Sequence, residues 1–64
     1  MITIDFFDAN GRFVVRHIIE FEEDCYYKLS DAEDYIKRIF SWYKDVGSAV
    51  VQMDGITQGY QRYE

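Results

Sequence analysis

Carboxylates are the most concentrated chemical groups in this 64-residue sequence. Residues 20–34 contain seven acids and one base, Lys28, so the segment carries a charge of −6 while all other residues together sum to +1. The seven acids are Glu20, Glu22, Glu23, Asp24, Asp31, Glu33 and Asp34. Such a cluster can form an electrostatic docking patch that meets a basic surface and speeds encounter. It can equally be a solvated connector followed by a well-capped helix.

Two more specific roles for these carboxylates are mimicry of nucleic-acid phosphates and binding of a metal ion. Mimicry needs carboxylates spread over a broad face, because duplex DNA carries one charge per about 1.7 Å of its axis. Seven acids in one segment could begin such an array, above all in a dimer. An EF-hand needs acids at alternating positions, a central glycine and a closing glutamate, and neither residues 8–11 nor residues 22–24 continue in that pattern. We therefore expect no metal site.

The sequence offers few groups for catalysis. Cys25 is the only cysteine, so it cannot form an internal disulfide, and its acidic neighbours disfavour the reactive thiolate. His17 stands among aliphatic residues, where a structural histidine is more common than a catalytic one. We find no Ser-His-Asp set, paired-carboxylate motif or glycine-rich phosphate loop. We expect neither an enzyme nor a cofactor site, and any catalytic candidate would have to centre on His17.

Aromatic side chains are the second group suited to recognition. The chain has six Tyr and one Trp, the residue types that dominate interface hot spots. We expect Tyr43 and Tyr60 in the core, because a chain with a single Leu must fill its core with other side chains. Tyr63 is a further surface candidate. The predicted partner-binding set joins acids and aromatics: Glu20, Glu22, Glu23, Asp24, Tyr26, Tyr27, Asp31, Asp34, Tyr35 and Trp42.

Two dipeptides predict the hairpins that would position these groups. Asn10-Gly11 lies between residues 2–7 and 12–21, and Asp54-Gly55 lies between residues 48–53 and 56–63. Both dipeptides favour type I′ turns, in which the two central residues have positive φ. In the first hairpin, a two-residue loop at Asn10-Gly11 pairs residues across the two strands so that the two residue numbers of each pair add up to 21. The set facing the core is then Ile2, Ile4, Phe6, Val15, His17 and Ile19, extended by Phe13 and Phe21.

Residues 30–46 predict the one helix. Ser30 and Glu33 form a capping box, and apolar residues follow at the spacing of a single helical face. These are Ala32, Ile36, Ile39, Phe40 and Tyr43. Gly47 is expected to end the helix as a left-handed cap. Residues 22–29 form a connector.

The element order ββαββ predicts an α+β fold in one small domain of residues 1–64. We expect a four-stranded, mostly antiparallel sheet with one helix on one face, and we take 2-1-3-4 as its strand order. One helix covers only one side of such a sheet. The open side would display Phe7, Val14, Ile18 and Val50, and an exposed apolar set usually marks an interface. These four residues are the candidate dimer face.

Composition and charge exclude several classes of function, and two classes remain. No apolar run exceeds three residues, whereas a membrane span needs about 20, and no secretion signal is recognisable, so we expect a cytoplasmic protein without membrane contact. Scattered bases and a net charge of −5 disfavour direct nucleic-acid binding. We expect a non-enzymatic protein-binding module, an accessory, regulatory or inhibitory protein of the kind found in phages and mobile elements, docking on a basic partner surface. The alternative is a homodimeric assembly protein that pairs through its open sheet face.

Overall fold

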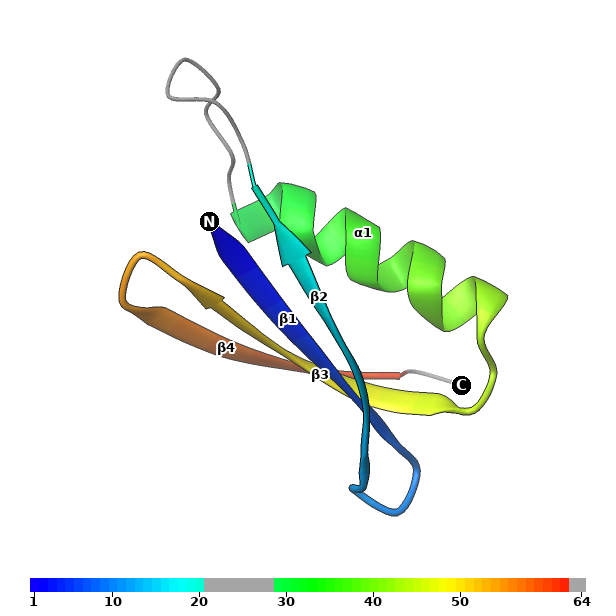
Figure 1. Ribbon diagram of the computed structural model, residues 1–64. Helices are drawn as coiled ribbons and strands as arrows, with labels where there is room; N and C mark the ends of the chain where they lie inside the picture. Colours follow the sequence, from blue (N-terminus) through cyan, green and yellow to red (C-terminus); the bar gives the residue numbers. More distant parts are fainter. Residues whose placement is uncertain (21–28, 63–64) are drawn as a thin grey trace.

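The computed structural model describes residues 1–20 and 29–62 and shows one helix on one face of a four-stranded sheet (Figure 1). The strands are β1 (Ile2–Asp8), β2 (Phe13–Ile19), β3 (Val46–Met53) and β4 (Ile56–Gln61), and the helix is α1 (Leu29–Trp42). All neighbouring strands are antiparallel, and their order is β2-β1-β3-β4. The predicted α+β class, the ββαββ order and the strand order are confirmed. No helix among the described residues is long and apolar enough to cross a membrane.

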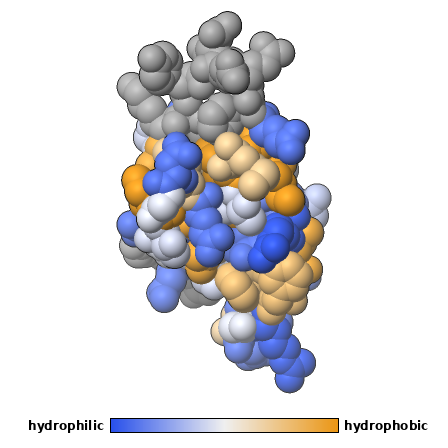
Figure 2. Space-filling view, turned by 60° about the vertical axis from the view of Figure 1, so that its left-hand side comes forward, coloured by the Kyte–Doolittle hydropathy of each residue, from blue (hydrophilic) through white to orange (hydrophobic). Residues whose placement is uncertain are grey.

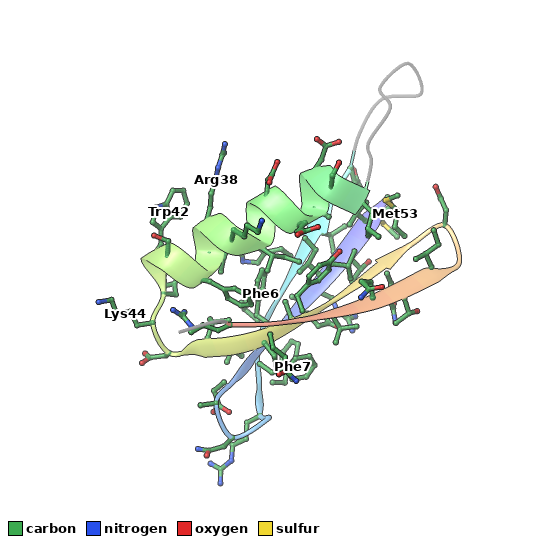
Figure 3. The ribbon with its side chains drawn as sticks, turned by 180° about the vertical axis from the view of Figure 1, so that it is seen from behind. Phe6, Phe7, Arg38, Trp42, Lys44 and Met53 are labelled. Atoms are coloured by element: carbon green, nitrogen blue, oxygen red, sulfur yellow. The ribbon has the colours of Figure 1, made fainter. Side chains whose placement is uncertain are left out.

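The core lies between α1 and the two central strands. Alternate residues of β1, namely Ile2, Ile4 and Phe6, are fully buried, as are Ala49 and Val51 of β3. Figure 3 shows Phe6 between the helix and the sheet, with its neighbour Phe7 on the opposite side of the sheet. The helix contributes Ala32, Ile36 and Ile39 to the same cluster. Full burial of each large side chain contributes about 1.5–3 kcal/mol, so β1 and β3 are the strands on which the fold depends most.

The β1–β2 hairpin has the predicted register but a different turn. Ile2 pairs with Ile19 and Phe6 with Val15. However, Gly11 alone in this loop has positive φ (82°), so the predicted type I′ turn at Asn10-Gly11 is wrong. The Asp8 carboxylate accepts bonds of 2.9 Å from the backbone N–H groups of Asn10 and Arg12, and the Gly11 N–H donates to the Asp8 carbonyl at 3.0 Å. These bonds stabilise a three-residue loop that ends in a glycine bulge.

A second irregularity changes which side chains of β2 face the helix. The register shifts between Phe6 and Phe7, so Phe7 stands opposite Phe13 instead of Val14. One extra residue in a strand reverses the alternation of its faces. Phe13 therefore lies on the open side, its ring edge-on to that of Phe7 with centroids 6.1 Å apart, and Val14 lies on the helix side beside Tyr43. The predictions that Phe13 faces the core and that Val14 belongs to the open face are both wrong.

The helix ends at Trp42, four residues before its predicted end. Tyr43 makes the last helical bond, N–H to the Ile39 carbonyl at 2.8 Å, and Val46 begins β3. Val46 is buried, whereas Tyr43, which was expected in the core, is 58% exposed. Gly47 lies within β3 without positive φ, so it is not a helix cap. A Cβ atom at position 47 would lie 3.0 Å from the Ala9 Cα. A glycine is therefore required because the backbone here packs closely against the first hairpin loop.

The β3–β4 hairpin matches its prediction. Met53 pairs with Ile56, and the intervening Asp54 and Gly55 both have positive φ, 47° and 81°, as in a type I′ turn. Ala49 and Val51 are buried beneath the helix, so Val50 between them lies on the open side, as predicted. Tyr60 lies opposite Ala49 and packs, partly buried, against the core.

Candidate functional site

In the part of the chain that the structure describes, the helix has a hollow along each of its two sides. The hollow between α1 and β2, here called the β2 groove, has a volume of about 310 Å³. The hollow between α1 and β4, here called the β4 groove, has a volume of about 390 Å³. Both lie along an outer strand, because one helix is too narrow to cover four strands. They differ in the chemistry of their walls.

The β2 groove has an apolar floor and an unpaired acid at its rim. Ile39 and Val46 form the floor and are almost completely buried. The walls are Val14 and Val15 of β2 and the exposed ring of Tyr43. Asp45 also lines the groove, and its carboxylate makes no hydrogen bond or ion pair with any described residue. An apolar groove with few polar groups is the usual form of a recognition site.

His17 contributes the other polar group of the β2 groove, and its contacts give it a structural role. Its Nδ1 atom lies 2.5 Å from the Tyr35 hydroxyl. Its ring is edge-on to those of Phe6 and Tyr35, with centroid distances of 5.1 and 5.7 Å. Tyr35, predicted as a recognition residue, is half-buried and has its hydroxyl engaged by His17. The pair therefore fixes the side of α1 against β2.

The β4 groove uses its charged groups in contacts within the chain. Arg62 donates from Nε to the Val46 carbonyl at 2.7 Å and from Nη2 to the Tyr43 carbonyl at 2.6 Å. The Arg62 guanidinium also lies over the Phe40 ring, 5.3 Å from its centroid. At the rim, Glu33 and Lys37 form an ion pair at 3.6 Å. Partial burial, together with the charge of Glu33, raises the pKa of the Tyr60 hydroxyl above its usual range.

The predicted partner-binding residues fall into separate places. Glu20, Asp31 and Asp34 are exposed where the end of β2 and the start of α1 lie at the same end of the molecule (Figure 1). Trp42, also exposed, lies about 17 Å further along the helix from Asp31, given a rise of 1.5 Å per residue, and points away from the sheet (Figure 3). Five further members lie outside the described residues: Glu22, Glu23, Asp24, Tyr26 and Tyr27. Phe21 and Tyr63 lie outside them as well.

The open sheet face is mixed in character. Ile18 is exposed, while Phe7 and Val50 are half-buried. Between them Arg16 donates from Nε to Asp5 Oδ1 at 2.6 Å, and this hydrogen bond and the charge of Asp5 raise the pKa of Arg16. The face turned toward the viewer in Figure 2 likewise shows apolar areas separated by hydrophilic side chains. Three of the four predicted dimer-face residues thus share one face, and Phe13 replaces the fourth.

Sequence reasoning missed the β2 groove because it placed the helix end too late. With a helix through residue 46, Tyr43 belongs to the buried stripe and Asp45 lies in the last turn of the helix. Alternation of buried residues holds only for Ala49 and Val51. It does not reach Val46, which is buried out of phase because the β1–β3 register shifts between Ser48 and Val46, so the period-2 pattern could not have placed the start of β3. The described residues contain no group of three His, Cys, Asp or Glu side chains placed to hold a metal ion.

Comparisons with protein-family models, with curated proteins and with solved structures found no match for this chain. Its function must therefore be inferred from its own residues.

Proposed function

We propose that this chain is a protein-binding module, a small acidic accessory, regulatory or inhibitory protein that acts by docking on a basic surface of a protein partner and not by catalysis. The exposure of β2 is the observation that carries the proposal. Four of its seven residues are large hydrophobic side chains in contact with solvent. They are Phe13 (59% exposed), Val14 (47%), Val15 (38%) and Ile18 (55%). Concentrated exposed apolar surface marks interaction sites in soluble proteins.

The position of β2 in the sheet supports the same function. Among the described strands, β2 pairs with β1 alone, so its outer edge has no strand neighbour. Proteins usually protect such edges with lysines, prolines, bulges or a covering segment. β2 has a bulge near Val14 and one charged side chain, Arg16, but within the described residues it has no lysine, proline or covering segment. Both of its faces carry exposed apolar side chains.

The charge distribution supports a basic partner. Glu20 directly follows β2, and Asp31 and Asp34 are exposed on the first turns of the adjacent helix. The chain as a whole carries −5. Complementary charge raises the rate of encounter and selects against acidic partners. The apolar strand would then supply contact area, and the acids would supply orientation.

Site-specific photocrosslinking in the native host tests the proposal. A benzoylphenylalanine at Phe13 or Ile18 is expected to crosslink to a protein partner, whereas the same probe at Thr57 or Gln61 on β4 is not. The second pair is the matched control, because both strands are outer strands and all four positions are exposed. Replacing Glu22, Glu23 and Asp24 together by Lys should abolish capture of the partner without unfolding the chain. Equal crosslinking from β2 and β4, or capture unaffected by the triple reversal, would contradict the proposal.

Homodimerisation through the open sheet face is a second candidate, favoured by the edge-on Phe7–Phe13 ring pair, in which Phe13 is exposed and Phe7 is half-buried. Paired aromatic rings beside Ile18 could pack against the same rings of a second copy. Sedimentation equilibrium would then give twice the monomer mass, and Phe13→Asp would return it to the monomer. A monomer at millimolar concentration would remove this candidate.

A further inference from the structure

We infer that the β2 groove binds an arginine or lysine side chain of an extended partner segment that adds to the outer edge of β2. This inference rests on the proposed function and specifies the partner's chemistry. Three observations on the described residues carry it: the outer edge of β2 pairs with no described strand, the apolar groove lies directly beside that edge, and the Asp45 carboxylate at the rim of the groove has no described partner.

The free edge accounts for the extended conformation of the partner. A segment that adds to a sheet edge gains main-chain hydrogen bonds, and alternate side chains provide specificity by entering pockets. Every second side chain of a strand added to β2 would project to the helix side of the sheet, where Val14, Val15 and Tyr43 form the groove walls. The volume of about 310 Å³ is at the lower limit of small-molecule sites, roughly 300–1,000 Å³. The groove is therefore large enough to admit one long side chain.

The groove lining accounts for a cationic side chain with an apolar stem. The methylene groups of lysine or arginine pack on apolar walls while the charged end reaches a polar rim. The walls are valine side chains, and the rim carries the Asp45 carboxylate. The exposed ring of Tyr43 can accept the cation over its face. Arg16 does not neutralise Asp45, because it is bound to Asp5 on the open side of the sheet.

The β4 groove excludes the same occupant and so shows that the choice is specific. Its lining includes the cations Lys37 and Arg62. Arg62 already occupies the face of Phe40, and Glu33 is already paired with Lys37. An incoming cation would meet like charges and find no free carboxylate there. The two grooves thus have similar size and opposite preference.

A second copy of this chain does not supply the cation. If two β2 strands paired antiparallel about a twofold axis perpendicular to the sheet, the Arg16 side chain of each copy would stay on the open face. The acidic chains would also repel each other, with −5 on each. The occupant is therefore a basic segment of a different protein.

Titration of the full chain with a defined peptide tests the inference. The probe is an acetylated and amidated peptide that alternates Thr and Arg over seven residues, so that all Arg side chains share one face. Two-dimensional NMR is expected to show shifts at β2 and at Tyr43–Val46. Asp45→Asn should raise Kd about fivefold, the upper range for an exposed ion pair. Asp54→Asn is the matched control: it removes the same charge at the distant β3–β4 turn, where asparagine tolerates positive φ, and should leave Kd unchanged.

A second peptide with citrulline in place of Arg keeps the shape and the hydrogen-bonding groups but removes the charge, and it should bind at least fivefold more weakly. Equal binding of the two peptides, equal effects of Asp45→Asn and Asp54→Asn, or shifts confined to β4 would each overturn the inference. If the peptide does not bind but the β2 crosslinks to a partner persist, the occupant is wrong and the proposed function stands. Crosslinks to a second copy alone would overturn both.

Discussion

The two outer strands of the sheet occupy equivalent positions but differ in how they are covered. β4 exposes one large hydrophobic side chain, Ile56, beside the polar Thr57, Gln58 and Gln61, and Arg62 lines the groove next to it and bonds within the chain. β2 exposes four large hydrophobic side chains, and the groove beside it holds the Asp45 carboxylate, which has no partner among residues 1–20 and 29–62. The architecture alone does not decide which edge is available for binding. Both strands are sheet edges. The difference lies in the grooves beside them: the Arg62 side chain bonds to the backbone in the β4 groove, and no described side chain does so in the β2 groove.

Arg62 is the residue that makes this difference. Its guanidinium bonds two carbonyls in the turn and strand that follow α1 and covers Phe40. Among the described residues, none on the β2 side of the helix binds the helix end in this way. On that side, the His17–Tyr35 contact joins the strand to the middle of the helix, which leaves the helix end and Tyr43 exposed.

The largest expected effect is a loss of stability that distinguishes a residue of the core from a residue on the β2 surface. Phe6→Ala removes a fully buried ring and should lower the free energy of unfolding by about 3–5 kcal/mol. A chain of this length has about 3–10 kcal/mol in total, so we expect Phe6→Ala to be largely unfolded by far-UV circular dichroism. Phe13→Ala, at an exposed ring, should cost less than about 1 kcal/mol. Similar losses in urea melts of the two variants would contradict the assignment of Phe13 to the surface.

The next effect concerns the β4 side. Arg62→Ala should lower the free energy of unfolding by about 1–3 kcal/mol, because it removes two charge-assisted hydrogen bonds and the contact with Phe40. Arg62→Lys keeps the charge but not the forked geometry and should recover only part of the loss. Thermal unfolding measures both variants. An Arg62→Ala variant as stable as the native chain would show that the β4 groove is not held in this way.

A smaller effect is expected on the β2 side of the helix. Tyr35→Phe leaves His17 Nδ1 without its hydrogen-bond partner and should cost about 0.5–1.5 kcal/mol. Tyr43→Phe serves as the control, because the Tyr43 hydroxyl makes no hydrogen bond with a described residue and its loss should be neutral. Urea unfolding at constant pH distinguishes the two. Equal stability of both variants would mean that His17 does not depend on Tyr35.

The smallest expected effect is a pH dependence located at β4. The pKa of Tyr60 is raised in the folded chain by burial first and by Glu33 second. The folded state therefore holds the proton more tightly than the unfolded state, and stability falls as pH rises above the unfolded pKa near 10. Urea midpoints measured from pH 9 to 11 should fall more steeply for the native chain than for Tyr60→Phe. Parallel curves would contradict the assigned cause.

The hairpins and the helix could be predicted from the sequence because their signals are local. Asp54 and Gly55 form a turn because both residues readily adopt positive φ. The spacing of apolar residues from Ala32 to Ile39 determines the buried face of the helix. The wrong prediction of the first turn arose because a neighbouring side chain changes the backbone conformation that the dipeptide favours. The Asp8 carboxylate reorganises the turn at Asn10-Gly11, and no propensity for the dipeptide alone includes that bond.

The candidate site was harder to predict than the fold, because it depends on two boundaries shifted by a few residues. The bulge that moves Val14 to the helix side and the helix end that exposes Tyr43 together form the β2 groove. Gly47 was interpreted as a helix cap because a glycine after an amphipathic stretch usually is one. A glycine is needed at position 47 because the backbone there packs against Ala9, which lies 38 positions earlier in the chain.

The pairing of β1 with β3 also has a consequence for the order of folding. Each hairpin closes a short loop and can form within about 1–10 μs, but an isolated hairpin is marginally stable. The central ladder joins Ile2 to Met53, residues at nearly opposite ends of the described chain. We therefore expect this long-range closure to limit the folding rate and to make unfolding all-or-none. Neither hairpin should survive alone when the other is cut away.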